Sequence, residues 1–133
     1  MKNVSEKILE LLRTAEVTKS GNDKWITLGE LPDRDVEKLS KILAFDVSGF
    51  IRIIDVSSIK HVLKDHPNMK DTDFCLIPLI LDNPDSIEPG NNPDSILYKK
   101  TFKESYYYVE YVRKGRKKLA MKTFYKTKNR PKK

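Results

Sequence analysis

The only two histidines of the chain, His61 and His66, lie five residues apart in the segment Ile59-Lys60-His61-Val62-Leu63-Lys64-Asp65-His66. An imidazole that solvent can reach exchanges protons near neutral pH, so the pair could supply general acid and base catalysis. On an ideal helix, His66 falls near the apolar face and His61 projects about 140° away. Pro67 disfavours helical geometry at His66, which frees that side chain to turn toward the same cleft. The alternative is a histidine that only interacts with the last carbonyls of a helix.

The residues that commonly bind metals do not form a site. The single cysteine, Cys75, lies in the apolar run Phe74-Cys75-Leu76-Ile77, which predicts a buried structural thiol. With no third histidine, zinc would need carboxylates such as Asp65, Asp71 or Asp73, and the acidic residues are too scattered for a two-metal nuclease. The sequence therefore predicts neither a metal nor another cofactor. The lone cysteine fits a reducing, cytoplasmic compartment.

Positive charge gathers at the C-terminal end. Residues 98–133 hold 14 of the 26 Lys and Arg and only two of the 19 acidic residues, a net charge of +12, whereas the first 97 residues sum to −5. Clustered cations bind phosphates through counterion release, so this asymmetry predicts a nucleic-acid partner. A basic tail that only aids solubility is the alternative. No apolar run approaches the roughly 20 residues that cross a bilayer, so no membrane partner is expected.

The histidine segment must be held by a helix, and periodicity predicts where the helices lie. Apolar residues at helical spacing predict helices over residues 4–13, after Leu31-Pro32-Asp33, after Asp55 or Ser57, and over Phe74–Leu81 with Asp73 as its cap. Runs rich in β-branched residues predict strands over Trp25–Leu28 and Phe50–Ile54. The repeated Asn-Pro-Asp-Ser between Asp82 and Asp94 predicts a loop with turns.

The C-terminal third becomes strand-like. Strands are expected over Ile96–Phe102, Tyr106–Arg113 and Lys118–Lys126, the last two joined across Lys114-Gly115, as an antiparallel meander. Because helices come first and strands follow, the expected fold class is α+β, with N-terminal helices packed on one face of a C-terminal antiparallel sheet. The other face is left for solvent or substrate.

Length and composition indicate one soluble domain. The 133 residues are 38% hydrophobic and 34% charged, which suits a globular protein with a modest core. We expect an N-terminal helical extension over residues 1–20 and a single α+β domain over residues 21–128. Residues 129–133 are expected to form a basic, flexible tail, because they have nothing to bury.

Side chains of the expected sheet could contact a polyanion. Strand alternation predicts two faces for the last strand: Leu119, Met121, Thr123 and Tyr125 on one, and Ala120, Lys122, Phe124 and Lys126 on the other. The cations Lys99, Lys100 and Arg113 border the sheet and could hold a phosphate backbone. The tyrosines of the middle strand distribute over both faces, so some belong to the core and some are free to stack on bases.

Three segments of the chain, taken in their order along the sequence, resemble a known family. They are the two-histidine segment Gly49–His66, the segment Ile77–Ile87 with its Ile-Pro and Pro-Asp-Ser-Ile, and the closing strand Met121-Lys122-Thr123-Phe124-Tyr125. In this order they resemble the phage barnase-EndoU-colicin-RelE-like nucleases. The resemblance covers roughly residues 25–128, and the helix before Gly21 lies outside it.

The resemblance implies helices stacked on a short antiparallel sheet and metal-independent ribonuclease activity of the toxin kind. By that likeness, His61 corresponds to the helix histidine of the family, and Thr123 and Tyr125 match polar positions of its last strand. A toxic nuclease also implies an acidic immunity or antitoxin protein as a partner, beside RNA. If the chain belongs to a larger toxin, it would be delivered into the cytoplasm of a target cell.

The corresponding hypothesis for the chemistry is attack of the RNA 2′-hydroxyl on phosphorus, which leaves a 2′,3′-cyclic phosphate. His61 is the expected general base or acid, and His66 or Tyr125 the complementary proton donor or an orienting group. Thr123 would hydrogen-bond a nonbridging oxygen. The expected substrate-binding residues are the cations Lys99, Lys100, Arg113 and Lys122. Two other classes stay open: a non-catalytic RNA- or DNA-binding module, and a phage-associated protein-interaction adaptor.

Overall fold

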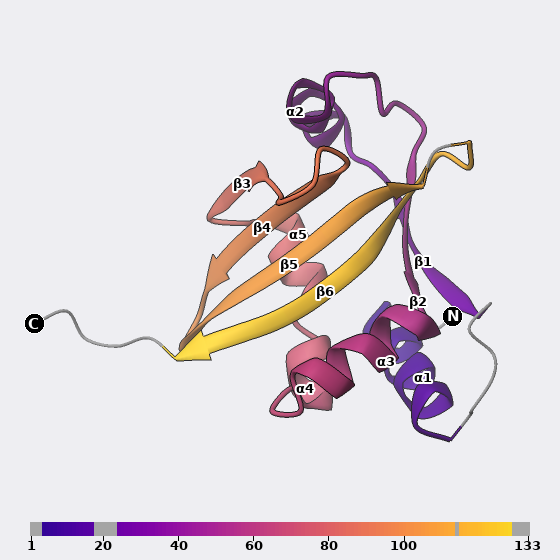
Figure 1. The fold of residues 1–133 in the computed structure, drawn as a ribbon, viewed down its shortest axis with the longest axis vertical. Helices are drawn as coiled ribbons and strands as arrows, with labels where there is room; N and C mark the ends of the chain where they lie inside the picture. Colours follow the sequence, from indigo (N-terminus) through magenta and orange to yellow (C-terminus); the bar gives the residue numbers. More distant parts are fainter. Residues whose placement is uncertain (1–3, 18–23, 114, 129–133) are drawn as a thin grey trace, which may run out of the picture.

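The computed structural model describes residues 4–17, 24–113 and 115–128. They form a six-stranded sheet with the order β1-β2-β6-β5-β4-β3 and helices packed against it (Figure 1). The strands are β1 (Trp25–Glu30), β2 (Ile51–Asp55), β3 (Ser86–Pro89), β4 (Ser95–Thr101), β5 (Glu104–Arg113) and β6 (Lys118–Lys128). The helices are α1 (Val4–Val17), α2 (Asp33–Leu43), α3 (Val56–Asp65), α4 (Asp71–Phe74) and α5 (Ile77–Asp82). The predicted α+β class is confirmed, whereas the expected tail at 129–133 lies outside the described residues.

The sheet is mixed rather than purely antiparallel. Strands β4 to β6 form the expected antiparallel meander, and β3, which pairs antiparallel with β4, is an additional strand within the segment expected to be a loop. Strand β2 pairs in parallel with β6, from Ile51 opposite Lys118 to Ile53 opposite Ala120. Strand β1 pairs antiparallel with β2 and is the edge strand on that side of the sheet. The two N-terminal strands therefore extend the C-terminal sheet.

The expected fourth helix is two short helices. α4 ends at Phe74, and α5 begins at Ile77 with Pro78 in its first turn, where a missing backbone N–H costs no hydrogen bond. Cys75, expected to be buried, is only partly so, since it lies in the link between the helices. Asp73 lies within α4 rather than before a helix, and its carboxylate accepts a hydrogen bond from the Lys70 N–H at 2.8 Å.

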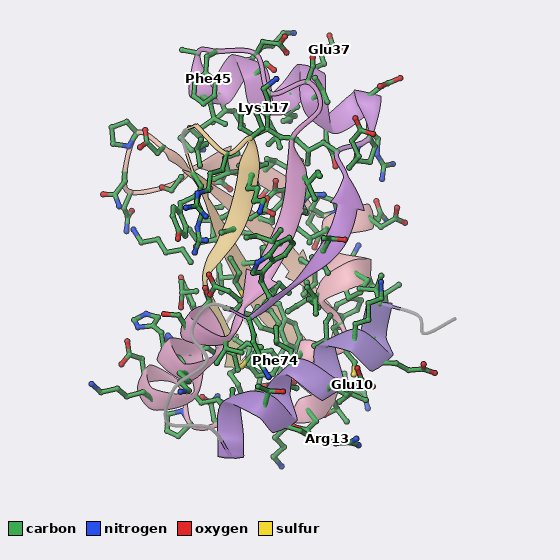
Figure 2. The ribbon with its side chains drawn as sticks, turned by 90° about the vertical axis from the view of Figure 1, so that its right-hand side faces the viewer. Glu10, Arg13, Glu37, Phe45, Phe74 and Lys117 are labelled. Atoms are coloured by element: carbon green, nitrogen blue, oxygen red, sulfur yellow. The ribbon has the colours of Figure 1, made fainter. Side chains whose placement is uncertain are left out.

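The hydrophobic core fills the space between the helices and one face of the sheet. α1 contributes its apolar stripe to the same cluster as the rest of the chain, through Ile8, Leu11, Leu12 and Ala15. Figure 2 shows Phe74 inside the molecule, with Glu10 and Arg13 on the outer side of α1. Burying each large apolar side chain contributes about 1.5–3 kcal/mol, so α1 stabilises the sheet that follows it.

A cluster of charged side chains is buried on the core side of β2 and β5. The Arg52 guanidinium donates to Glu110 Oε2 at 2.8 Å and to the Tyr98 hydroxyl at 2.8 Å, and Asp35 lies 3.5 Å away. Glu110 is fully buried. Burial raises the pKa of Glu110 and the Arg52 charge opposes this shift, with a net rise. Removing one partner would leave a buried charge uncompensated, so the cluster fixes β2 against β5.

Helix α3 lies beside β6 because β2 separates early from β6, while it stays paired with β1. Pairing between β2 and β6 stops at Ile53 and Ala120, and Asp55 then caps α3 by accepting the Ser58 N–H at 2.8 Å. The Ser58 hydroxyl donates to the Met121 carbonyl at 2.6 Å, on the edge of β6 that β2 no longer covers. The histidine helix is thereby held along the strand that carries Thr123 and Tyr125.

Candidate active site on the open face of the sheet

One face of strands β4 to β6 is covered by none of the helices α1 to α5, and we call it the open face (Figure 1). In Figure 1, α5 lies behind these strands. Residues directly opposite one another in neighbouring strands project to the same side. The register therefore arranges the open face in three rows: Lys99-Tyr107-Tyr125, Leu97-Val109-Thr123, and Ser95-Tyr111-Ala120.

A β-bulge in β6 decides which side chains reach the open face. Val109 pairs with Thr123 but Glu110 pairs with Met121, which leaves Lys122 as the extra residue. Leu119 and Met121 are fully buried in the core, whereas Thr123 and Tyr125 project to the open face. The expectation that these four residues share one face was wrong, because simple alternation does not survive the extra residue.

The first row continues beyond the sheet edge to His66. Its ring stacks on that of Tyr125, with centroids 5.1 Å apart and planes 22° from parallel. Tyr125 stacks in turn on Tyr107 at 5.0 Å, and Lys99 Nζ lies 6.0 Å from the Tyr107 ring centroid. As expected from Pro67, α3 ends before His66, whose φ of −132° and ψ of 68° are not helical. The imidazole of His66, at the end of α3, therefore lies beside the open face.

The other histidine lies on α3 itself. His61 is half exposed, and its Nε2 is 3.3 Å from a carboxylate oxygen of Asp65, one helical turn later. Within the described part of the chain, His61 makes no hydrogen bond, ion pair or ring contact with β6, and its one partner is Asp65. A neighbouring carboxylate fixes the orientation of an imidazole, which is a requirement for proton transfer. The His66–Tyr125 ring contact is the direct link between α3 and the candidate residues of β6.

Thr123 and Lys122 lie where the bulge meets a depression. The depression has a volume of about 180 Å³ and is lined by Leu97 and Val109, by Thr123, Lys122 and Tyr125 of β6, and by Gly90, Asn91 and Ser95. The Thr123 hydroxyl is buried and has no hydrogen-bond partner among the described residues. Lys122 is exposed and makes no ion pair within the described part of the chain. A buried hydroxyl without a partner calls for an explanation, and a bound ligand is one.

The remaining candidate cations are engaged by the fold. Lys100 projects to the side of the sheet opposite Lys99, where its Nζ is 3.2 Å from Asp85. The Arg113 guanidinium donates to the Tyr111 hydroxyl at 2.9 Å and to the Asp55 carboxylate. Arg113 therefore helps to hold the residue that caps α3. Lys99 pairs with Glu88 at 3.2 Å but stays on the open face.

Sequence reasoning missed Asn91 and Ser95 as residues of this face, and it did not single out Tyr107 among the tyrosines of the middle strand. Tyr107 is the middle residue of three consecutive tyrosines. Only the pairing of β5 with β6, which sets Tyr107 opposite Tyr125, shows that Tyr107 lies on the open face. Asn91 comes from the turn between β3 and β4, and Ser95 is the first residue of β4; β3 was not predicted, and the expected strand began one residue later, at Ile96. The Gly-Asn-Asn-Pro sequence of residues 90–93 was the available signal for a tight turn.

Among the described residues, no three His, Cys, Asp or Glu side chains gather as a group that could hold a metal ion. None of the helices formed by these residues is long and apolar enough to span a bilayer.

Comparison with known proteins adds one finding. A family model described as phage-Barnase-EndoU-ColicinE5/D-RelE like nuclease3 matches residues 32–133. No curated protein and no solved structure matches the chain. The match covers α2 to α5 and every strand of the sheet except β1, including the open face and both histidines. The chain therefore belongs to the phage-Barnase-EndoU-ColicinE5/D-RelE like nuclease3 family.

Proposed function

We propose that the protein is a metal-independent endoribonuclease of toxin type, which cleaves RNA to a 2′,3′-cyclic phosphate on the open face of the sheet. The observation that carries this proposal is the contact of His66 with Tyr125, beside Thr123 and beside Lys122, which makes no ion pair with another described residue. Groups that exchange protons and a cation that binds phosphate therefore surround one small area. Membership of a nuclease family supports the same reading.

The reaction needs one base and one acid. The base removes the proton of a ribose 2′-hydroxyl, and that oxygen attacks the adjacent phosphorus. The bond from phosphorus to the 5′-oxygen breaks, and the acid protonates this oxygen as it leaves. All atoms of the new cyclic phosphate come from the RNA, so the protein supplies only proton transfer and charge stabilisation.

We assign proton transfer to His66 and His61, with Tyr125 as an orienting or donating hydroxyl. His66 is held against the open face by its stack on Tyr125, and His61 is oriented by Asp65. The neighbouring Lys122 ammonium and Thr123 hydroxyl would stabilise the charge that develops on the nonbridging oxygens. Lys99 would hold the RNA backbone at the far end of the first row. Lys100 is given no direct contact with RNA because it projects to the other side of the sheet, and Arg113 is given none because its guanidinium is engaged by Tyr111 and Asp55.

The proposed partners follow from the charge. RNA is drawn to the basic C-terminal end, whose 36 residues carry a net charge of +12. An acidic inhibitor protein would associate rapidly with the same end, which would protect the producing cell. The proposed place of action is the cytoplasm, where RNA substrates are abundant.

The test uses the purified full chain with bulk RNA and transfer RNA in excess EDTA. Cleavage in EDTA by the parent, and its loss in both His66→Ala and His61→Ala, is expected. Loss of a proton-transfer group costs about 10² to 10⁴ in rate. An exposed lysine of α3, Lys64, gives the matched control Lys64→Ala, which should cleave like the parent. Activity that needs a divalent metal, or salt-sensitive binding without cleavage, contradicts the proposal.

A further inference from the structure

The depression on the open face is larger than a phosphate needs, and neither histidine is among the residues that line it. Its floor is formed by the aliphatic side chains of Leu97 on β4 and Val109 on β5, which face each other in the second row. Thr123 and Lys122 lie at one side of this floor, and the turn between β3 and β4 forms the opposite wall. An apolar floor with a few polar groups at its rim is typical of a small-ligand pocket.

The wall is held together by hydrogen bonds between the turn and the start of β4. The Ser95 hydroxyl donates to the Asn92 carbonyl at 2.9 Å and accepts the Asn92 N–H at 3.1 Å, while the Gly90 N–H donates to the Ser95 carbonyl at 2.9 Å. A methyl group at position 90 would overlap the Ser95 side chain, so only glycine allows this close approach. Asn91 follows directly and is exposed at the rim. Its side-chain amide has both donors and an acceptor to offer a ligand.

We propose that this depression is a nucleobase subsite, which takes one unpaired base of the RNA on the Leu97–Val109 floor with Asn91 reading the base edge. The inference rests on the proposed ribonuclease function, because the ligand is the substrate of that reaction. A volume of about 180 Å³ has room for one planar base but not for a base pair. Proteins read RNA sequence mainly on single-stranded bases that are splayed out and hydrogen-bonded along an edge. Lys122, at the rim and without an ion pair among the described residues, would hold the phosphate attached to that nucleotide.

The arrangement defines the substrate class. The subsite shares Thr123, Lys122 and Tyr125 with the site of the chemistry, so a bound base places its own 3′-phosphate next to His66. A base that is paired in a helix cannot enter without unpairing. The enzyme is thus specific for single-stranded or looped RNA, with a preference for the base on the 5′ side of the cleaved bond.

The binding test titrates the four nucleoside 3′-monophosphates and inorganic phosphate separately into the full chain, followed by NMR of methyl and amide groups. Each mononucleotide binds without being cleaved, so the active protein is used. At least one nucleotide is expected to shift the methyl signals of Leu97 and Val109, whereas inorganic phosphate shifts only signals near Lys122 and Thr123. If every nucleotide gives the phosphate pattern, the subsite is wrong even where RNA is cleaved. If a base binds there but RNA is not cleaved, the proposed function fails and the subsite stands.

The specificity test compares Asn91→Ala with Asn83→Ala, an exposed asparagine at the end of α5 as the matched control. Loss of one hydrogen bond to the base should weaken binding of the preferred nucleotide and raise KM for its single-stranded oligonucleotide by about 3- to 10-fold, with kcat kept. Asn83→Ala should behave as the parent. Equal values for the two variants would overturn the role of Asn91. Equal cleavage of a single strand and of its perfect duplex would overturn the substrate class.

Discussion

His66, at the end of α3, stacks face to face on Tyr125 of β6, with ring centroids 5.1 Å apart. The contact joins the helical half of the chain to the open face of its sheet. Three features produce it: Pro67 ends the helix at His66, Ser58 holds α3 on the edge of β6, and the bulge at Lys122 turns Tyr125 to the open face.

The first prediction separates the imidazole from the stack. His66→Ala and His66→Phe should both lower the rate of RNA cleavage by about 10² to 10⁴, because neither side chain exchanges a proton. His66→Phe keeps an aromatic ring against Tyr125, so its melting temperature should equal that of the parent. Single-turnover cleavage and thermal unfolding measure the two effects. Parent-like cleavage by His66→Phe would reduce His66 to a packing residue.

The second prediction compares two stacked tyrosines. Tyr125→Phe and Tyr107→Phe each lose one hydroxyl and keep the ring stack at 5.0 Å. Because the Tyr125 hydroxyl is assigned to the reaction, Tyr125→Phe should lower kcat about 100-fold. Tyr107→Phe should leave kcat unchanged. Steady-state kinetics on one oligonucleotide checks both, and equal kcat values for the two variants would remove the assigned role of Tyr125.

A third prediction concerns the hydroxyl of Thr123. It has no hydrogen-bond partner among the described residues although it is buried, so Thr123→Val should leave the free energy of unfolding unchanged or raise it by up to about 1 kcal/mol. Cleavage should nevertheless fall about 100-fold, because a contact to the reacting phosphate is lost. Urea unfolding and single-turnover cleavage give the two values.

Thr127→Val is the matched control for that variant. Thr127 is an exposed threonine of the same strand, opposite Ser105. Its substitution should change neither quantity. If Thr123→Val unfolds more easily and cleaves normally, the Thr123 hydroxyl is a structural group with a partner.

The fourth prediction is a dependence of stability on pH through Asp73. Burial acts to raise the pKa of Asp73, but hydrogen bonds from the Tyr106 hydroxyl, the Lys70 N–H and Lys126 outweigh it and hold the pKa below its usual value. The folded pKa is thus below the unfolded one, so the stabilisation is present above about pH 4 and is lost as the pH falls further.

Thermal unfolding between pH 7 and pH 2 checks this dependence. Asp73→Asn should lower the melting temperature at pH 7 and show a shallower loss below about pH 4 than the parent. Asp33→Asn, which changes an exposed residue of α2, should follow the parent curve. Identical acid profiles for the parent and Asp73→Asn would mean that the Tyr106–Asp73 contact does not stabilise the fold.

Local sequence patterns predicted the elements well, because caps and apolar spacing act over a few residues. Asp55 caps α3, and Pro67 ends it before His66, as expected. Pro78 likewise starts a helix late, although the chain breaks there into α4 and α5. The two-histidine segment, the segment Ile77–Ile87 and the closing strand, in that order, suggested the nuclease family that the family model confirms.

Long-range pairing could not be predicted in the same way. Nothing in the local pattern of Ile51–Ile53 indicates a parallel partner at Lys118–Ala120, and that pairing places α3 beside β6. The bulge at Lys122 could not be predicted from the sequence either, because it depends on how β6 pairs with Val109 and Glu110 of β5. Glu110 lies in a strand of mostly apolar residues, and only the structure shows that it pairs with Arg52. Simple alternation therefore gave the wrong face for two residues of the last strand.

The central claim is that the 2′-hydroxyl of RNA is the nucleophile, and the chemical ends of the products test it most directly. Mass spectrometry of a single-stranded oligonucleotide cleaved in EDTA should find a 2′,3′-cyclic phosphate on the upstream fragment and a free 5′-hydroxyl on the downstream one. The same oligonucleotide with one 2′-deoxyribose at the cleaved position should stay intact there. A 5′-phosphate on the downstream fragment, or cutting at the deoxyribose, would contradict the mechanism.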